Sequence, residues 1–201
     1  EKGKLMCKFS EDSRQKLGNA VIYIANHTEQ LSKTKLLKLL FLMEEYMVKR
    51  YHVPFMGLPF EIWQAGPVAK DIFIDLSDGP FLLKDFVKTE VQKDATYIRA
   101  IKPFCDDEFS DCEMEMMDEI IRKYGKKTAK QLVAEVHKEG SLWFNAAKKH
   151  GLLTAFNKGL CNNSDYTIDF SEELSDCARE DYKESLAIHQ TANILKAQGY
   201  V

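Results

Sequence analysis

The apolar positions from Ser32 to Tyr51 recur at steps of three and four residues and also fill the gaps between those steps. They are Leu36, Leu37, Leu39, Leu40, Phe41, Leu42, Met43, Tyr46, Met47 and Tyr51. A helix that is apolar almost all round is usually buried inside a domain. With charged residues such as Lys35 and Glu44, it is too short and too polar to span a membrane. We therefore expect residues 32–51 to form the core helix of the protein.

The pattern before and after this helix predicts two more helices and three short strands. A first amphipathic helix is expected over 10–28, and the run of aromatic and β-branched residues over 60–64 predicts a strand. Gly66 and Pro67 then fit the N-cap and first residue of a helix that ends near Ser77. Residues 86–91 and 97–101 are expected to pair as two strands.

The second half of the chain reads as mainly helical. Four helices are expected here, opened by Ser110, Thr128, Ser141 and Ser171. Ser110 and Glu113 have the spacing of a capping box, and the last helix is expected to end near Lys196. Alternation over 166–170 predicts one more short strand. The whole reads as one domain over 1–201, mainly α with a small antiparallel β-sheet, its helices packed around residues 32–51.

Composition excludes several classes of protein. The apolar fraction of 45% and charged fraction of 29% are ordinary for a globular protein, and the formal net charge is −3. That balance gives no general attraction to nucleic acid or to an anionic membrane. Five cysteines without a CxxC pair favour reduced thiols in a cytoplasmic protein over a disulfide framework or a zinc site.

No pattern of catalytic residues is visible in the chain. The five histidines are scattered, and neither an HExxH, a GxSxG nor a phosphate-binding glycine pattern occurs. We expect no enzyme, no metal and no cofactor. The acidic run over 105–119 reads as a solvated helix start. Two basic clusters read as solvated faces, with phosphate contact as the open alternative. The first consists of Lys8, Arg14, Lys16, Lys33, Lys35 and Lys38, and the second of Lys126, Lys127 and Lys130.

Two tryptophans are the large anchors of the chain. Trp63 follows the predicted strand, and Trp143 lies in the helix opened by Ser141. A tryptophan beside a turn is either part of the core or half-exposed for a partner to grip. Core is the preferred interpretation of both, and the pattern alone leaves the alternative open.

The order of the motifs resembles the Panacea domain family of SocA-like antitoxins and phage-associated proteins. The resemblance lies in the run from Thr34 to Phe41, then in F-x-x-W-x-x-G-P-V over 60–68. A second block runs from Tyr124 to Trp143. Together these cover about residues 10–150 and leave 152–201 as a C-terminal extension with a strand and a long helix. The family-motif residues, which are candidates for a partner surface, are Thr34, Lys35, Lys38, Trp63, Gly66, Pro67 and Trp143.

The resemblance implies a bacterial, cytoplasmic and noncatalytic protein that binds and neutralises a cognate toxin, usually the product of an adjacent gene. It also implies that such a protein acts as a chaperone or delivers the toxin to a protease. The net charge and the short, charged core helix argue against a membrane partner, and a homodimer stays open. The alternative hypothesis is a nucleic-acid-binding regulator of its own operon. The amines of Lys35 and Lys38 are expected to reach the surface or to pair with carboxylates.

Overall fold

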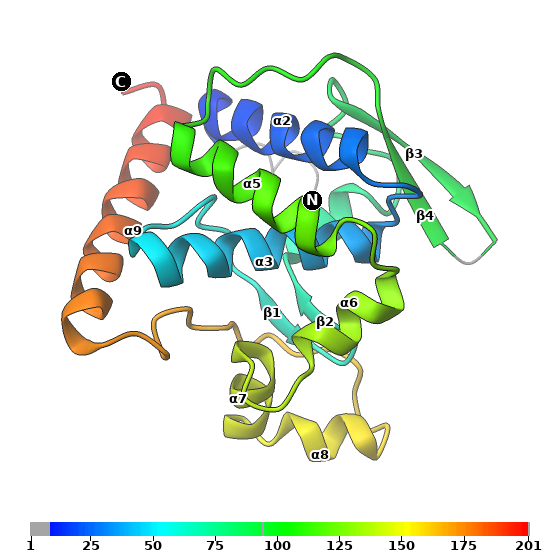
Figure 1. The fold of residues 1–201 in the computed structure, drawn as a ribbon, viewed down its shortest axis with the longest axis vertical. Helices are drawn as coiled ribbons and strands as arrows, with labels where there is room; N and C mark the ends of the chain where they lie inside the picture. The colour runs from blue at the N-terminus through cyan, green and yellow to red at the C-terminus, as the bar shows by residue number, and fades with distance from the viewer. Residues whose placement is uncertain (1–8, 94, 201) are drawn as a thin grey trace.

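The computed structural model describes residues 9–93 and 95–200, and helix α3 crosses its centre (Figure 1). The fold is mainly α with two small antiparallel sheets of two strands each. The elements in chain order are α2 (Glu11–His27), α3 (Lys33–Tyr51), β1 (Glu61–Trp63), β2 (Gly66–Val68), α4 (Lys70–Asp75), β3 (Val87–Gln92), β4 (Ala95–Ala100), α5 (Asp111–Tyr124), α6 (Ala129–Val136), α7 (Leu142–Lys149), α8 (Leu152–Asn157) and α9 (Asp176–Ala197).

Helix α3 is the core helix that its apolar pattern predicts. Every residue from Lys35 to Glu44 is buried, and the helix has neighbours from both halves of the chain. Helices α5 and α6, strand β2 and strand β4 all pack against it. Figure 1 shows α2 and α5 on one side of α3, with the β1–β2 hairpin and α6 on the other. The expectation of helices packed around this segment is therefore confirmed.

Local capping signals in the sequence correspond to real helix starts. Ser110 and Glu113 form the predicted capping box, in which the Ser110 amide donates to the Glu113 carboxylate at 2.9 Å. Thr128 and Ser141 cap α6 and α7 as expected. These caps succeed because Ser and Thr hydroxyls accept from the free amides of the first helical turn within three residues.

The assignment of Gly66 and Pro67 to a helix start was wrong. They belong to β2, which returns along β1 directly after a two-residue turn, and the next helix begins at Lys70. Ile62, which is paired with Pro67, donates its amide to the carbonyl oxygen of Tyr166 and not to β2. The two residues are therefore a non-hydrogen-bonded pair, so the missing N–H of Pro67 costs the sheet no hydrogen bond. The pair Gly–Pro is a good helix start and also a good hairpin position, so local sequence does not separate the two.

The C-terminal segment departs from expectation in three places. The final helix starts after Ser175, not after Ser171, because the Ser171 hydroxyl is bound to the Asp169 carboxylate in a preceding turn. Residues 166–170 make an isolated bridge from Thr167 to β1 and no strand. The short helix α8 was not predicted. Helix α9 then stands across the ends of the central helices (Figure 1).

Candidate functional site

The family-motif residues come together beside the first half of α3. Three lie on α3 itself, three lie on the β1–β2 hairpin that packs against it, and one lies on α7. Five of the seven are buried, namely Lys35, Lys38, Gly66, Pro67 and Trp143, whereas Thr34 and Trp63 are partly exposed. The motif therefore describes a packed framework more than a continuous outer surface.

Lys38 is a fully buried lysine with no carboxylate partner among the described residues. Its side chain is 1% exposed, and its Nζ atom donates a hydrogen bond to the carbonyl oxygen of Pro67 at 2.8 Å. Burial without a counter-charge lowers the pKa of this amine to about 7. The expectation of a snorkelling or carboxylate-paired amine was wrong, because the β1–β2 hairpin covers the side chain and offers a carbonyl oxygen in its place.

Gly66 provides the room that Lys38 needs. Its φ angle is +98°, and a Cβ atom at this position would lie 2.8 Å from Cε of Lys38 and 3.1 Å from Cγ2 of Val136. Any larger residue would therefore combine backbone strain with a clash against a buried side chain. The glycine of the motif is explained by this close approach of hairpin, helix α3 and helix α6.

Trp143 joins α7 to the same hairpin. Its indole nitrogen donates to the carbonyl oxygen of Trp63 at 3.0 Å, and its ring stacks on His137 at a centroid distance of 3.8 Å. Nε2 of His137 is buried and has no hydrogen-bond partner in the described part of the chain. Burial and the nearby charge of Lys38 lower the pKa of His137 to about 4. Sequence reasoning missed His137 because a single histidine after α6 carries no spacing signal.

Lys35 anchors the turn between α5 and α6. Its Nζ atom donates to the carbonyl oxygen of Gly125 at 2.6 Å and to that of Glu29 at 3.3 Å. Like Lys38, it binds backbone oxygens inside the protein, so the expectation of a surface or carboxylate partner was wrong here too. Burial lowers the pKa of this amine, and the charge of Glu29 opposes that shift. The motif lysine therefore holds in place a segment 90 positions further along the chain.

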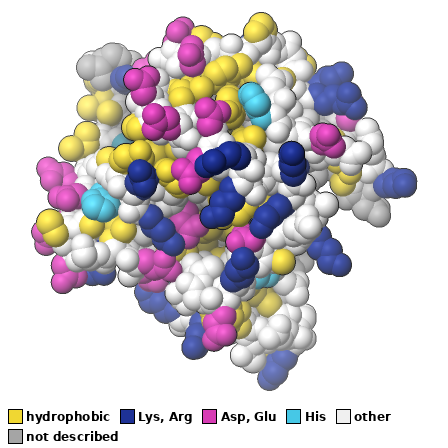
Figure 2. Space-filling model, in the orientation of Figure 1, with side chains coloured by type: hydrophobic (Ala, Val, Ile, Leu, Met, Phe, Trp, Pro, Cys, Tyr) yellow, Lys and Arg dark blue, Asp and Glu magenta, His cyan; other side chains and the backbone are white. Residues whose placement is uncertain are grey.

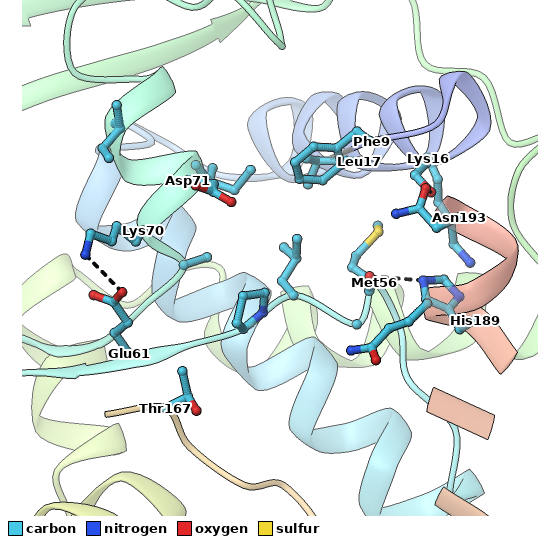
Figure 3. A pocket seen from close by; sticks show the side chains of 18 residues that line it. Phe9, Lys16, Leu17, Met56, Glu61, Lys70, Asp71, Thr167, His189 and Asn193 are labelled. Carbon is cyan, nitrogen blue, oxygen red and sulfur yellow. Dashed lines mark hydrogen bonds and ion pairs between the residues drawn. The ribbon is translucent and has the colours of Figure 1, made fainter. Parts of the chain in front are cut away.

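A separate pocket of about 550 Å³ lies between α2, α4, the 56–59 loop and α9 (Figure 3). Both lysines of its wall are paired: Lys70 pairs with Glu61, which also lines the pocket, at 3.2 Å, and Lys16 pairs with Glu113, which lies outside the lining, at 2.6 Å. Nε2 of His189, on α9, lies 3.2 Å from the carbonyl oxygen of Met56. Apolar side chains supply much of the remaining wall. The pocket is suited to an apolar side chain or a small ligand, and neither lysine among its described lining residues lacks a partner.

A family model described as antitoxin SocA-like, Panacea domain, matches residues 36–144, which is more than half of the chain. The chain belongs to this family. The matched Panacea segment contains Lys38, the β1–β2 hairpin and Trp143, so it includes most of the framework described above. Helices α8 and α9 lie beyond it. No curated protein and no solved structure matches the chain.

The Panacea assignment suggests an antitoxin-like, noncatalytic role. Within residues 9–93 and 95–200, no group of three or more His, Cys, Asp and Glu side chains is placed to hold a metal ion. The four cysteines in these ranges, at positions 105, 112, 161 and 177, are free thiols, and Cys7 lies outside them. No helix in the same ranges is both long and apolar enough to cross a membrane.

Proposed function

We propose that this protein binds and neutralises a cognate toxin protein, encoded beside it, by covering the toxin's active surface without chemistry of its own. The observation that carries the proposal is the match to the SocA-like antitoxin family over residues 36–144. The packed framework around Lys38 and Gly66 agrees with a binding scaffold, since it uses the motif residues to fix backbone positions.

The decisive experiment is co-expression with the product of the neighbouring gene. The proposal predicts that the neighbour arrests growth when expressed alone, that the protein restores growth, and that the two purify together. Measuring the amount of toxin separates two routes, because occlusion or chaperoning leaves the toxin level unchanged, whereas delivery to a protease lowers it. A folded protein that neither restores growth nor retains the neighbour would contradict the proposal.

The C-terminal helix α9 is our candidate for partner-specific contact. It lies outside the matched segment and exposes large apolar side chains, with Ile188 64% and Ile194 54% exposed. Removing the helix would also uncover the core, because Tyr182 is only 5% exposed. Point substitutions are the cleaner test. Ile188→Asp together with Ile194→Asp should weaken toxin binding while the thermal unfolding temperature stays unchanged.

A nucleic-acid-binding regulator is the second candidate, and the lysines favour it only in part. In the first cluster Lys38 and Lys35 are buried, Lys16 is paired with Glu113, and Nζ of Lys33 lies 3.8 Å from the centre of the Phe73 ring. The second cluster is mostly exposed. Salt-dependent binding to DNA upstream of the gene would support this candidate, and an absence of binding at low salt would remove it.

A further inference from the structure

Residues 122–130 carry five cations and no carboxylate, although the whole chain has a net charge of −3. These cations are Arg122, Lys123, Lys126, Lys127 and Lys130, and we refer to them as the basic face. Only Lys127 has a carboxylate partner within the described residues, since its amine lies 2.7 Å from Glu135. The other four are exposed. Figure 2 shows Lys and Arg side chains gathered across the middle of this side, over the end of α5 and over α6.

A groove of about 550 Å³ between α3 and α5 adjoins the basic face. Its floor is apolar, because Leu42, Ile120 and Tyr124 are at most 7% exposed. Arg50 and Lys123 stand on its two sides, so cations reach it from both helices. Tyrosine and arginine beside an apolar floor are enriched at protein interfaces, and Tyr46, Tyr124 and Arg50 all line this groove.

The basic face is held rigidly relative to the groove. Lys35 binds the carbonyl oxygen of Gly125 and so fixes the turn that carries Lys126 and Lys127. The amines of Lys123 and Lys127 flank the ring of Tyr124, at 5.0 and 5.1 Å from its centre. A preorganised surface loses less conformational freedom on binding, which favours affinity.

We infer that the basic face and the adjoining α3–α5 groove are the docking surface for an acidic segment of the partner protein. Carboxylates of that segment would pair with the exposed Lys and Arg side chains, and an apolar or aromatic residue beside them would enter the groove. This inference deepens the proposed function and rests on it, since the partner is taken to be the toxin.

Two features favour an acidic protein over nucleic acid. Glu45 and Glu119 line the same groove, and Glu119 accepts a hydrogen bond from the Tyr46 hydroxyl at 2.7 Å. Fixed carboxylates repel a continuous phosphate backbone, whereas a protein segment places its charges only where the basic residues lie. The net negative charge of the chain also opposes general binding to a polyanion.

The test is a triple charge reversal on the full chain, Lys123→Glu, Lys126→Glu and Lys130→Glu. Binding to the purified product of the neighbouring gene is measured by calorimetry at low and moderate salt. We expect the triple variant to bind about tenfold more weakly or worse, and to lose most of the salt dependence of the wild type. The matched control reverses three exposed lysines on other elements, Lys84, Lys148 and Lys158, and should bind like the wild type.

Each other outcome contradicts the inference in a distinguishable way. If the wild type and the triple variant bind the neighbour equally well, the docking surface is wrong and the proposed function stands. If the wild type neither binds the neighbour nor restores growth, the proposed function itself fails. Loss of binding to upstream duplex DNA, with partner binding intact, would assign the basic face to nucleic acid. Loss of a dimer of the chain alone would assign it to a second copy.

Discussion

The Nζ atom of Lys38 lies 2.8 Å from the carbonyl oxygen of Pro67, and no carboxylate in the described part of the chain balances its charge. The contact joins the core helix to the β1–β2 hairpin, which carries the W-x-x-G-P-V part of the family motif. Gly66 is needed directly beside it, because a Cβ there would press on the lysine stem. The lysine and the glycine of the motif therefore belong to the same packing contact, because the buried lysine fits only beside a residue without a Cβ atom.

The buried amine predicts that stability depends on pH above neutrality. The pKa of Lys38 is about 7 in the folded protein and 10.5 ordinarily, so between these values the unfolded chain binds more protons. This contribution to stability therefore rises with pH across that window and is least below pH 7. The wild type and Lys38→Met are compared by urea unfolding from pH 6 to 9. We expect the free energy of unfolding of the wild type to rise, relative to that of the variant, as the pH rises. The slope should be at most roughly 1.4 kcal/mol per pH unit.

The control for that experiment is Lys148→Met, which makes the same chemical change at an exposed position of α7. It should leave the pH dependence of unfolding unchanged. Parallel pH profiles for the wild type and Lys38→Met would contradict a buried, uncompensated amine.

Gly66→Ala should destabilise the protein by about 2–4 kcal/mol, because strain at positive φ adds to crowding against Lys38 and Val136. Gly140→Ala separates the two effects. Gly140 has a φ angle of +84° but nothing within 4 Å of the position its Cβ would take. It should therefore show the strain alone and a smaller loss in thermal unfolding. Equal losses at the two sites would show that the close approach at Gly66 is unimportant.

Trp143→Phe should cost about 1–3 kcal/mol, since a smaller aromatic ring replaces the buried indole and the donor to the Trp63 carbonyl is lost. Trp63→Phe is the comparison, because that indole donates to the half-buried Glu61 carboxylate and the residue is itself partly exposed. Chemical denaturation of both variants gives the two values. A larger loss for Trp63→Phe would reverse the ranking of the two tryptophans.

Glu44 predicts a pH dependence of the opposite sign. Its buried carboxylate accepts hydrogen bonds from the three backbone amides of residues 55–57. Burial nevertheless raises its pKa from 4.5 to about 7. Between those values the folded protein binds more protons, so this contribution to stability falls as pH rises. With Lys38, the two contributions sum to a minimum near pH 7. Glu44→Gln should flatten the unfolding profile below pH 7 and leave the slope above pH 7 intact.

Local signals in the sequence were enough to predict much of the fold. The apolar run gave α3 as the core, and the Ser110–Glu113 capping box marked the start of α5, because both depend on residues a few positions apart. Whether Gly66 and Pro67 start a helix or form a strand depends on whether the chain reverses after Trp63. That is decided by packing against α3, which no local pattern shows.

The candidate site was predictable in its members but not in its arrangement. The carbonyl partner of Lys38 lies 29 positions away in the chain, and the closer of the two partners of Lys35, Gly125, lies 90 positions away, so spacing carries no information about these two contacts. His137 stacks on Trp143 only because α6 and α7 fold back on each other. The motif named the residues, and only the structure shows that most of them are buried.

The most direct test of the central claim is a binding measurement between the purified full chain and the purified product of the neighbouring gene. The account predicts a stable complex, together with loss of the neighbour's toxic activity in proportion to the amount of complex formed. Titration calorimetry combined with an activity assay on the same samples gives both values. No binding by a chain that unfolds cooperatively, with the toxin fully active in its presence, would contradict the antitoxin-like role.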